Sequence, residues 1–237
     1  MELIGDLGAE ELASALPERP MRSYPALLST DADARAWARA GAPAGAVVAA
    51  EYQASPRGRA GLEWQIAHGR GFAFSLVLRP KLPLAREGWL YVVAVSGLAD
   101  ALEARIRWPD EVVDGTRRIG AVGVHAEIGA TTLEWAVASV LVADAQPPRA
   151  PLLAEVVRAI EARAASTTAP VLADYLRRCE TIGKRVRARM IPMGPGGLVL
   201  EGRAETVRPD GSLVIETGDG RRLAIRAQNL GLLDEVG

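Results

Sequence analysis

Two arginines separated by one glycine mark the stretch of the chain most suited to chemistry, "EYQASPRGRAGLEW" at residues 51–64. Arg57 and Arg59 stand among small residues, after an apolar run and before Trp64. Small residues let backbone amides come close to a ligand, and guanidinium groups pair with carboxylate or phosphate oxygens in a fork geometry. The stretch therefore predicts a binding loop for a carboxylate or a phosphate. The alternative is a surface loop whose arginines simply meet water.

The histidines and the single cysteine carry a weaker signal. His68 lies in a turn and is expected to be solvated. His125 and Glu127 share one face of a predicted strand, but two ligands make a weak case for a metal, so we interpret them as a surface pair. Cys179 follows the apolar stripe of a predicted helix and is expected in the core. We therefore expect no metal site built from side chains.

The hydrophobic pattern of the sequence predicts the strands and helices that position the arginine loop. Residues 46–52, directly before the loop, form a continuous apolar run that is typical of a central strand. Further strands are expected at residues 71–80, 105–108, 111–113, 118–128 and 133–143. Helices are expected at residues 29–41, 87–104, 150–164 and 170–183, with Gly183 ending the last one. Ser29 or Thr30 can cap the first helix.

The character of the chain changes after Gly183. Residues 184–233 are short apolar segments separated by Gly, Pro and Asp-Gly turns, a pattern typical of hairpins. About five strands in some fifty residues favour a small β-barrel. We therefore predict two domains, at residues 1–182 and 183–237.

Composition excludes several classes of protein. The chain has 237 residues, of which 49% are hydrophobic and 24% charged, as in ordinary globular proteins. A formal net charge of −1 gives no overall field that would attract nucleic acid or an anionic membrane. The N-terminus lacks a signal-peptide core, no window is long and apolar enough to span a bilayer, and the single cysteine fits a reducing compartment. We expect a cytoplasmic protein with neither nucleic acid nor membrane as partner.

Four blocks in a fixed order resemble the catalytic domain of bacterial biotin protein ligases. They are "STDA", "EYQASPRGRAGLEW", "RWPDEVVDG" and "RRIGAVGVHAE", and the C-terminal segment resembles the SH3-like domain of the same family. The resemblance covers roughly residues 22 to 233. It implies an α+β fold, with helices on one side of a mixed sheet and a small C-terminal SH3-like β-barrel. Only about twenty residues precede the catalytic part, so no DNA-binding domain is expected.

The resemblance also implies a reaction. In this family a biotin carboxylate attacks the α-phosphorus of ATP to form an acyl-adenylate, and a lysine of a biotin carboxyl carrier domain then takes the acyl group. Both reactants of the first step are anions, so fixed cations must screen their repulsion, and the adenylate must be kept from water. ATP and Mg²⁺ are the cofactors implied, biotin is the substrate, and the partner is the carrier domain of a carboxylase.

Roles for single residues follow from the same resemblance. Arg59 and Arg118 are the catalytic cations. The acid and its head group would be bound by Ser29, Thr30, Gln53, Arg57, Gly58 and Gly61. The nucleotide would be bound by Trp64, Arg107, Trp108 and Asp110.

The chain departs from the family at several of these positions. Asp110 stands where the family has an asparagine, and the added negative charge near the triphosphate is tolerable mainly if Mg²⁺ lies there. Arg118 stands where the family has a lysine that contacts both reacting groups. No lysine occurs between Lys81 and Lys184 to replace it, and a planar guanidinium is not equivalent to an ammonium.

The pocket itself also differs from the family pattern. The glycine-rich strand end beneath the ligand is replaced by Ala138, Val140 and Val142, whose branched members would narrow the floor. In the loop, Pro56 replaces a glycine and Ala60 an arginine. Three hypotheses therefore stay open: a biotin ligase, a ligase for another carboxylic acid, and a non-catalytic homologue that binds a small acid, a nucleotide or a carrier protein.

Overall fold

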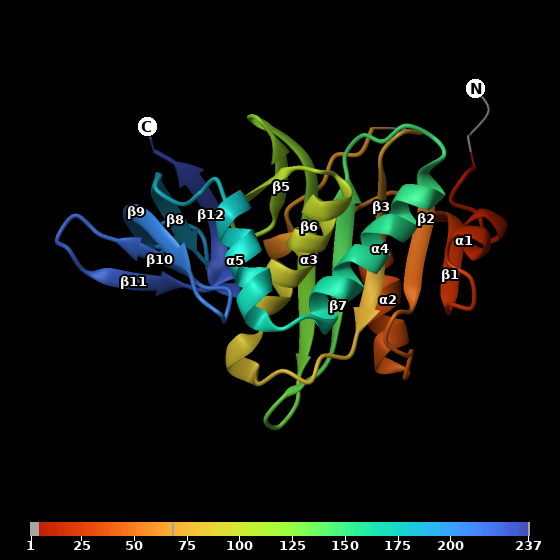
Figure 1. The fold of residues 1–237 in the computed structure, drawn as a ribbon, viewed down its shortest axis with the longest axis horizontal. Helices are drawn as coiled ribbons and strands as arrows, with labels where there is room; N and C mark the ends of the chain where they lie inside the picture. Colours follow the sequence, from red (N-terminus) through yellow and green to blue (C-terminus); the bar gives the residue numbers. More distant parts are fainter. Residues whose placement is uncertain (1–4, 68, 237) are drawn as a thin grey trace.

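A seven-stranded mixed sheet forms the centre of the protein in the computed structural model, which describes residues 5–67 and 69–236 (Figure 1). The strand order is β1-β2-β3-β7-β6-β5-β4. Its strands are β1 (Met21–Leu27), β2 (Val47–Gln53), β3 (Phe72–Leu78), β4 (Arg105–Arg107), β5 (Glu111–Asp114), β6 (Arg117–Ile128) and β7 (Leu133–Val142). Strand β1 runs parallel to β2, and all other neighbours are antiparallel. The mixed sheet is as predicted.

Helices cover both faces of this sheet. The helices are α1 (Ala9–Ala15), α2 (Thr30–Arg39), α3 (Trp89–Ala101), α4 (Arg149–Ala165) and α5 (Thr168–Arg178), with short 3₁₀ turns at Arg59–Gly61, Leu84–Arg86 and Ala227–Asn229. Along β7, Ala138 and Val140 belong to the main core with α3 and α4, whereas Trp135 and Val137 pack with Ala34 of α2. Because successive strand side chains point to opposite faces, α2 lies on the face opposite to α3 and α4. The expectation of helices on one side was wrong.

A second, five-stranded antiparallel sheet follows the last helix (Figure 1). It contains β8 (Arg185–Met190), β9 (Val199–Val207), β10 (Leu213–Glu216), β11 (Arg222–Ile225) and β12 (Leu230–Glu235), in the order β11-β10-β9-β8-β12. This is the predicted number of strands, and the separate small sheet is confirmed. Its closure into a barrel and the domain boundary at residues 182–183 stay predictions.

Side chains of the first sheet's domain reach directly into the second sheet. Trp108 is 2% exposed, and its indole Nε1 donates to the carbonyl oxygen of Gly211 at 3.0 Å. Arg86 donates to the carbonyl oxygen of Pro209 and to Thr168 Oγ1 at 2.8 Å. The backbone N–H of Trp108 donates to Thr181 Oγ1 at 2.9 Å. These contacts fix the position of the second sheet beside the turn after β4.

Sequence patterning missed two elements and misplaced the end of a third. Helix α1 and strand β1 were not predicted, because a short helix and a strand interrupted by Pro25 leave only a weak pattern. Helix α5 ends at Arg178 and not at Gly183. The chain leaves the helix early because Cys179 forms a β-bridge with Ile106, and the Glu180 N–H donates to the Ile106 carbonyl at 2.8 Å. Cys179 is buried, as expected.

No helix in the described part of the chain has the length and apolar character needed to cross a bilayer.

Candidate functional site

The arginine loop, residues 54–66, is a compact structure that packs on itself. Arg57 holds its two ends together, donating to Gly61 O at 3.0 Å and Ser55 Oγ at 3.1 Å, and it lies 3.4 Å from a carboxylate oxygen of Glu63. Its side chain is 51% exposed. The predicted ligand-binding Arg57 therefore closes the loop while its charge remains open to solvent.

Trp64 fastens the loop to the sheet. It is 6% exposed and packs with Ala73 and Leu141. A Cβ added to Gly58 would lie 2.2 Å from Trp64 Nε1, so glycine is required there by the tryptophan rather than by open space for a ligand. Gly61 has φ +72°, a backbone conformation that favours glycine. The indole of Trp64 is largely buried in this packing, although Trp64 also lines two cavities, and its predicted contact with adenine stays a prediction.

Arg59 leaves the loop in the opposite direction and is 7% exposed. Its Nε lies 3.1 Å from Asp110 Oδ1. Its Nη1 donates to the carbonyl oxygens of Leu230 and, at 3.1 Å, of Gly231 in β12. One buried cation therefore joins the loop, the turn between β4 and β5, and the C-terminal sheet.

A second group of charges surrounds Glu111. Arg107 Nη1 and Arg118 Nη1 each lie 3.3 Å from one of its carboxylate oxygens. Arg107 also lies 3.5 Å from Glu235. Arg118, the predicted catalytic cation, is 37% exposed and is paired with a carboxylate. Trp108, predicted at the nucleotide, is 2% exposed and donates to Gly211, and it also lines the smaller cavity described below.

Burial perturbs the carboxyl of Asp110. The pKa of Asp110 is raised from the ordinary 3.8 to about 6: removal from water and the charge of Glu111 raise it, and the guanidinium groups of Arg59 and Arg118 lower it. Arg59 therefore neutralises the carboxylate that we expected Mg²⁺ to balance. Among the described residues no three His, Cys, Asp or Glu side chains are grouped as a metal site would need.

The predicted head-group residues meet in a buried hydrogen-bond chain. Gln53 Oε1 accepts from the Thr30 N–H at 2.9 Å and from Thr30 Oγ1 at 3.2 Å, and its Nε2 donates to Ala73 O at 2.7 Å. Ser29 occupies the N-cap position of α2 but makes no side-chain cap hydrogen bond. The structure thus brings Thr30 and Gln53 together, with Ser29 next to them.

Two serines that sequence analysis missed, Ser75 and Ser139, extend this chain of hydrogen bonds. Ser75 Oγ donates to Thr30 Oγ1 at 3.0 Å and lies 2.9 Å from Ser139 Oγ, which lies 3.4 Å from Asp31 Oδ1. Both serines interrupt otherwise apolar strands, "FAFSLVL" and "LEWAVASVLV". A polar residue in a buried strand needs a partner, and that was the signal available in the sequence.

Two cavities meet at Arg59. One, of about 310 Å³, is bounded by the loop, α2 and the middle of β6 and β7, and its polar lining includes Asp31, Arg57, Ser139 and the missed His125. The other, of about 80 Å³, is lined by Trp64, Arg107, Trp108, Asp110, Glu111 and Arg118. Arg59 lines both. Small-molecule pockets have volumes from about 300 Å³, so the smaller cavity must widen to admit a nucleotide.

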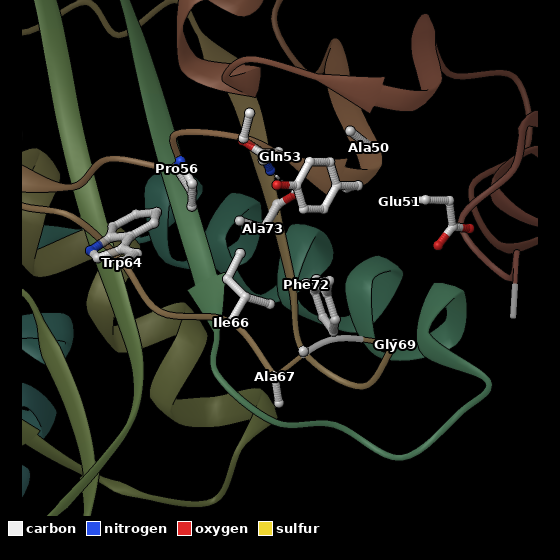
Figure 2. Close-up of a pocket in the computed structure, with 13 residues that line it drawn as sticks. Ala50, Glu51, Gln53, Pro56, Trp64, Ile66, Ala67, Gly69, Phe72 and Ala73 are labelled. Carbon is white, nitrogen blue, oxygen red and sulfur yellow. Dashed lines mark hydrogen bonds between the residues drawn. The ribbon is translucent and has the colours of Figure 1, made fainter. Parts of the chain in front are cut away.

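A further hollow of about 240 Å³ lies between the loop and the ends of β2 and β3. Figure 2 shows it between Trp64 and Ile66 on one flank and Glu51 on the other. The carboxylate of Glu51 accepts from the Leu7 N–H at 2.5 Å and from the buried Arg149. Glu51 therefore has a structural role, whereas Gln53, two residues on, faces the hydrogen-bond chain described above.

The predicted narrowing of the pocket floor was wrong. Val140, Ala138 and Val142 point to the face covered by α3 and α4 and belong to the main core. The intervening Ser139 points to the cavity side. The strand alternation places the branched side chains away from any ligand, so they do not obstruct it.

The histidines take the following positions. His125 lies with its ring centroid 5.6 Å from that of Trp135, and burial lowers its pKa. Glu127 lies 3.9 Å from Arg39. His125 and Glu127 therefore contact different partners, Trp135 and Arg39. His68 lies outside the described residues.

Curated relatives match part of the chain. The bifunctional ligase/repressor BirA of Bacillus spizizenii is 32% identical over 99 residues, which is 39% of this chain and 30% of the relative. BirA of Bacillus subtilis is 34% identical over 101 residues, 40% of this chain and 31% of the relative. The matched region thus spans less than a third of the length of these relatives. The chain matches no protein-family model.

Solved structures match almost the whole chain. The biotin protein ligase of Aquifex aeolicus, in complex with biotin and ATP, has a TM-score of 0.70 at 17% identity and covers 92% of this chain and 99% of its own. A biotin protein ligase-like protein of unknown function from Silicibacter sp. TM1040 has a TM-score of 0.68 at 15% identity, covering 90% and 96%. These likenesses establish the fold.

Proposed function

We propose that this chain, a member of the biotin protein ligase family, activates a carboxylic acid with ATP and transfers the acyl group to a lysine of a carrier protein. The observation that carries the proposal is the position of Arg59, a buried cation that lines two cavities and belongs to the loop at residues 54–66. The acid would occupy the larger cavity and the nucleotide the smaller one, with their reacting groups meeting at the guanidinium. The Aquifex aeolicus ligase of the same fold binds biotin and ATP.

Residues of this protein would take part in the first step of the reaction and protect its product. The acid carboxylate attacks the α-phosphorus of ATP and pyrophosphate leaves; Arg59 and Arg118 offset the repulsion between the two anions. Thr30, Gln53 and Ser139 orient the head of the acid through the buried hydrogen-bond chain. The loop excludes water from the acyl-adenylate. The carrier lysine then attacks the acyl carbon, AMP leaves, and the amine loses its proton to solvent.

The nucleotide requires movement around the smaller cavity. Arg107 and Arg118 would exchange their carboxylate partner for phosphate oxygens. Because the described residues hold no metal-ligating cluster, Mg²⁺ would arrive on the phosphates of ATP, and none of the steps above depends on it. A biotin carboxyl carrier domain in the cytoplasm would be the acceptor, and neither nucleic acid nor membrane is needed.

A binding module without catalysis is the second candidate. It is favoured by the pairing of both catalytic cations with carboxylates, Arg59 with Asp110 and Arg118 with Glu111. In that case the protein would bind an acid, a nucleotide or a carrier and form no adenylate.

Detection of the intermediate separates the two candidates. The protein is incubated with ATP and each of a panel of carboxylic acids that includes biotin, and the acid-quenched mixture is searched for acyl-AMP by mass spectrometry. We expect acyl-AMP with at least one acid, and little or none with biotin. If calorimetry detects binding of an acid or ATP while no acid yields acyl-AMP, the binding module is the correct function.

A further inference from the structure

We propose that Asp110 is the resident counter-anion of Arg59, which fastens the arginine loop to β12 in the free protein and gives up the guanidinium to an anionic ligand. The attachment of the loop to β12 through Arg59 and Asp110 requires no ligand. The exchange for a ligand rests on the proposed function, in which an acyl-phosphate anion reaches Arg59. Asp110 is thus a positioning residue that acts through Arg59.

The fastening follows from the contacts of a single side chain. The side chains of Arg59 and Asp110 are only 6% and 10% exposed, and the Nε–Oδ1 distance is 3.1 Å. The same guanidinium donates to the carbonyls of Leu230 and Gly231. A buried cation left without its anion is strongly unfavourable, so the carboxylate is what allows Arg59 to remain between the loop and β12.

The negative charge of Asp110 distinguishes this contact from the one that an asparagine would make. An asparagine, which the resembled family has at this position, can accept a hydrogen bond but cannot neutralise a guanidinium. With Asp110 the loop is held before any ligand arrives, and the two cavities remain separated by Arg59. A ligand long enough to occupy both cavities must therefore draw Arg59 away from Asp110.

Release of Arg59 changes the protonation of Asp110. Burial already raises the pKa of this carboxyl to about 6, and the charge of Arg59 is what opposes a larger rise. The charged or titratable groups near Asp110 are Arg59 from the loop, Glu111 and Arg118 from β5 and β6, Tyr91 from α3 and Tyr175 from α5. Once Arg59 pairs with a ligand, it no longer opposes the effect of burial, so the pKa of Asp110 rises further and the carboxyl binds protons more tightly. Ligand binding is then coupled to proton uptake.

Hydrogen–deuterium exchange of the free protein tests the fastening without any ligand. Asp110→Asn keeps the shape of the side chain and removes its charge. We expect amide exchange in residues 56–63 and 230–232 to become faster by about tenfold or more. Glu111→Gln is the matched control, because Glu111 is the adjacent carboxylate and pairs with Arg107 and Arg118 but not with Arg59. Unchanged exchange in Asp110→Asn, or equal acceleration in both variants, would overturn the fastening.

Calorimetry tests whether an anionic ligand replaces Asp110 as the partner of Arg59. The probe is a non-hydrolysable biotinyl-adenylate analogue with an acyl-sulfamate link, titrated at pH 7 in buffers of different ionisation enthalpy. We expect net proton uptake on binding in the wild type and none in Asp110→Asn. Binding without proton uptake in the wild type would contradict the release of Arg59. If the analogue binds neither protein, the release of Arg59 to a biotinyl-adenylate is overturned and biotin is excluded as the acid, while hydrogen exchange still decides whether Asp110 fastens the loop and acyl-AMP detection still decides the proposed function.

Discussion

At the scale of single residues, two arginines beside the smaller cavity are each paired with a carboxylate. Arg59 and Arg118 were predicted as catalytic cations, and both lie beside the smaller cavity. Their carboxylate partners, Asp110 and Glu111, come from a turn and a strand some fifty residues after the loop. Which charges meet depends on strand register and turn geometry, which hydrophobic patterning does not encode.

Arg118→Lys tests whether the guanidinium limits the use of biotin. A lysine ammonium is a compact charge that can sit between carboxylate and phosphate, whereas a guanidinium binds in its plane and is held here by Glu111. We expect the wild type to show weak or no biotin-dependent ATP–pyrophosphate exchange and Arg118→Lys to raise it. Arg117→Lys is the control, because Arg117 is 67% exposed and pairs with Asp114. Robust biotin-dependent turnover by the wild type would show that Arg118 already replaces the lysine in function.

If the site is instead tuned to another acid, the same substitution has the opposite effect. Arg118→Lys should then lower exchange with that acid and add nothing with biotin. The two outcomes distinguish a biotin site altered by substitution from a site with a different specificity.

The buried carboxyl of Asp110 predicts a pH dependence of stability. Its pKa is about 6 in the folded protein and about 4 in the unfolded chain, so between these values the folded state binds a proton that the unfolded state has released. Ionised Asp110 pairs with Arg59, but its lost hydration costs more than this pair returns, so the contribution of Asp110 to the free energy of unfolding is greatest below pH 4 and is lost as the pH rises through 6. Relative to Asp110→Asn, the wild type should lose up to about 3 kcal/mol between pH 4 and 7. Denaturant unfolding at both pH values measures it, and a difference that does not vary with pH would contradict the assignment.

At the scale of elements, the sequence predicted the strands and helices that carry the site. Strand β2 ends at Gln53, directly before the loop, as the apolar run indicated. The two faces of β7 were read wrongly, because a continuous apolar run does not reveal which alternate residues face the helices. Only Ser139, the polar residue in that run, marks the face of the cavity.

The loop offers two substitutions with opposite effects on stability. In Gly58→Ala the new methyl would lie 2.2 Å from Trp64 Nε1, and overpacking of this kind lowers the free energy of unfolding by about 1–3 kcal/mol. Ala60 has φ +56°, a left-handed conformation that disfavours any side chain. Ala60→Gly should therefore leave stability unchanged or raise it by up to about 1 kcal/mol. Chemical denaturation of both variants measures the pair, and an equal loss in both would show that Trp64 does not restrict Gly58.

At the scale of the whole molecule, the two sheets share one core. Val186 and Leu213 of the C-terminal sheet belong to the same cluster of buried apolar residues as Val140 and Trp108. The sequence predicted the change in architecture after Gly183 but could not predict this continuity, since it depends on how the surfaces of the two sheets fit together. Any boundary between the two sheets, including the one predicted at residues 182–183, therefore crosses a continuous apolar core.

The shared core predicts cooperative unfolding. Scanning calorimetry of the wild type should give one transition whose calorimetric and van't Hoff enthalpies agree, because melting the second sheet would expose buried apolar surface of the first. Two resolved transitions, or a stable fragment of residues 1–182 released by proteolysis, would favour independent domains.

Arg59 is proposed to lie where an acid and ATP react. The test is acid-dependent ATP–pyrophosphate exchange, measured over a panel of acids for the wild type and for Arg59→Ala. This assay detects adenylate formation without the carrier protein. We expect exchange by the wild type with at least one acid, and a decrease in Arg59→Ala of about 2–3 kcal/mol in transition-state stabilisation, the range for truncating a charge-assisted hydrogen bond. Arg221→Ala is the control, because Arg221 is 80% exposed and pairs only locally with Asp219. Exchange that is absent with every acid, or that is equal in the wild type and Arg59→Ala, would contradict the claim.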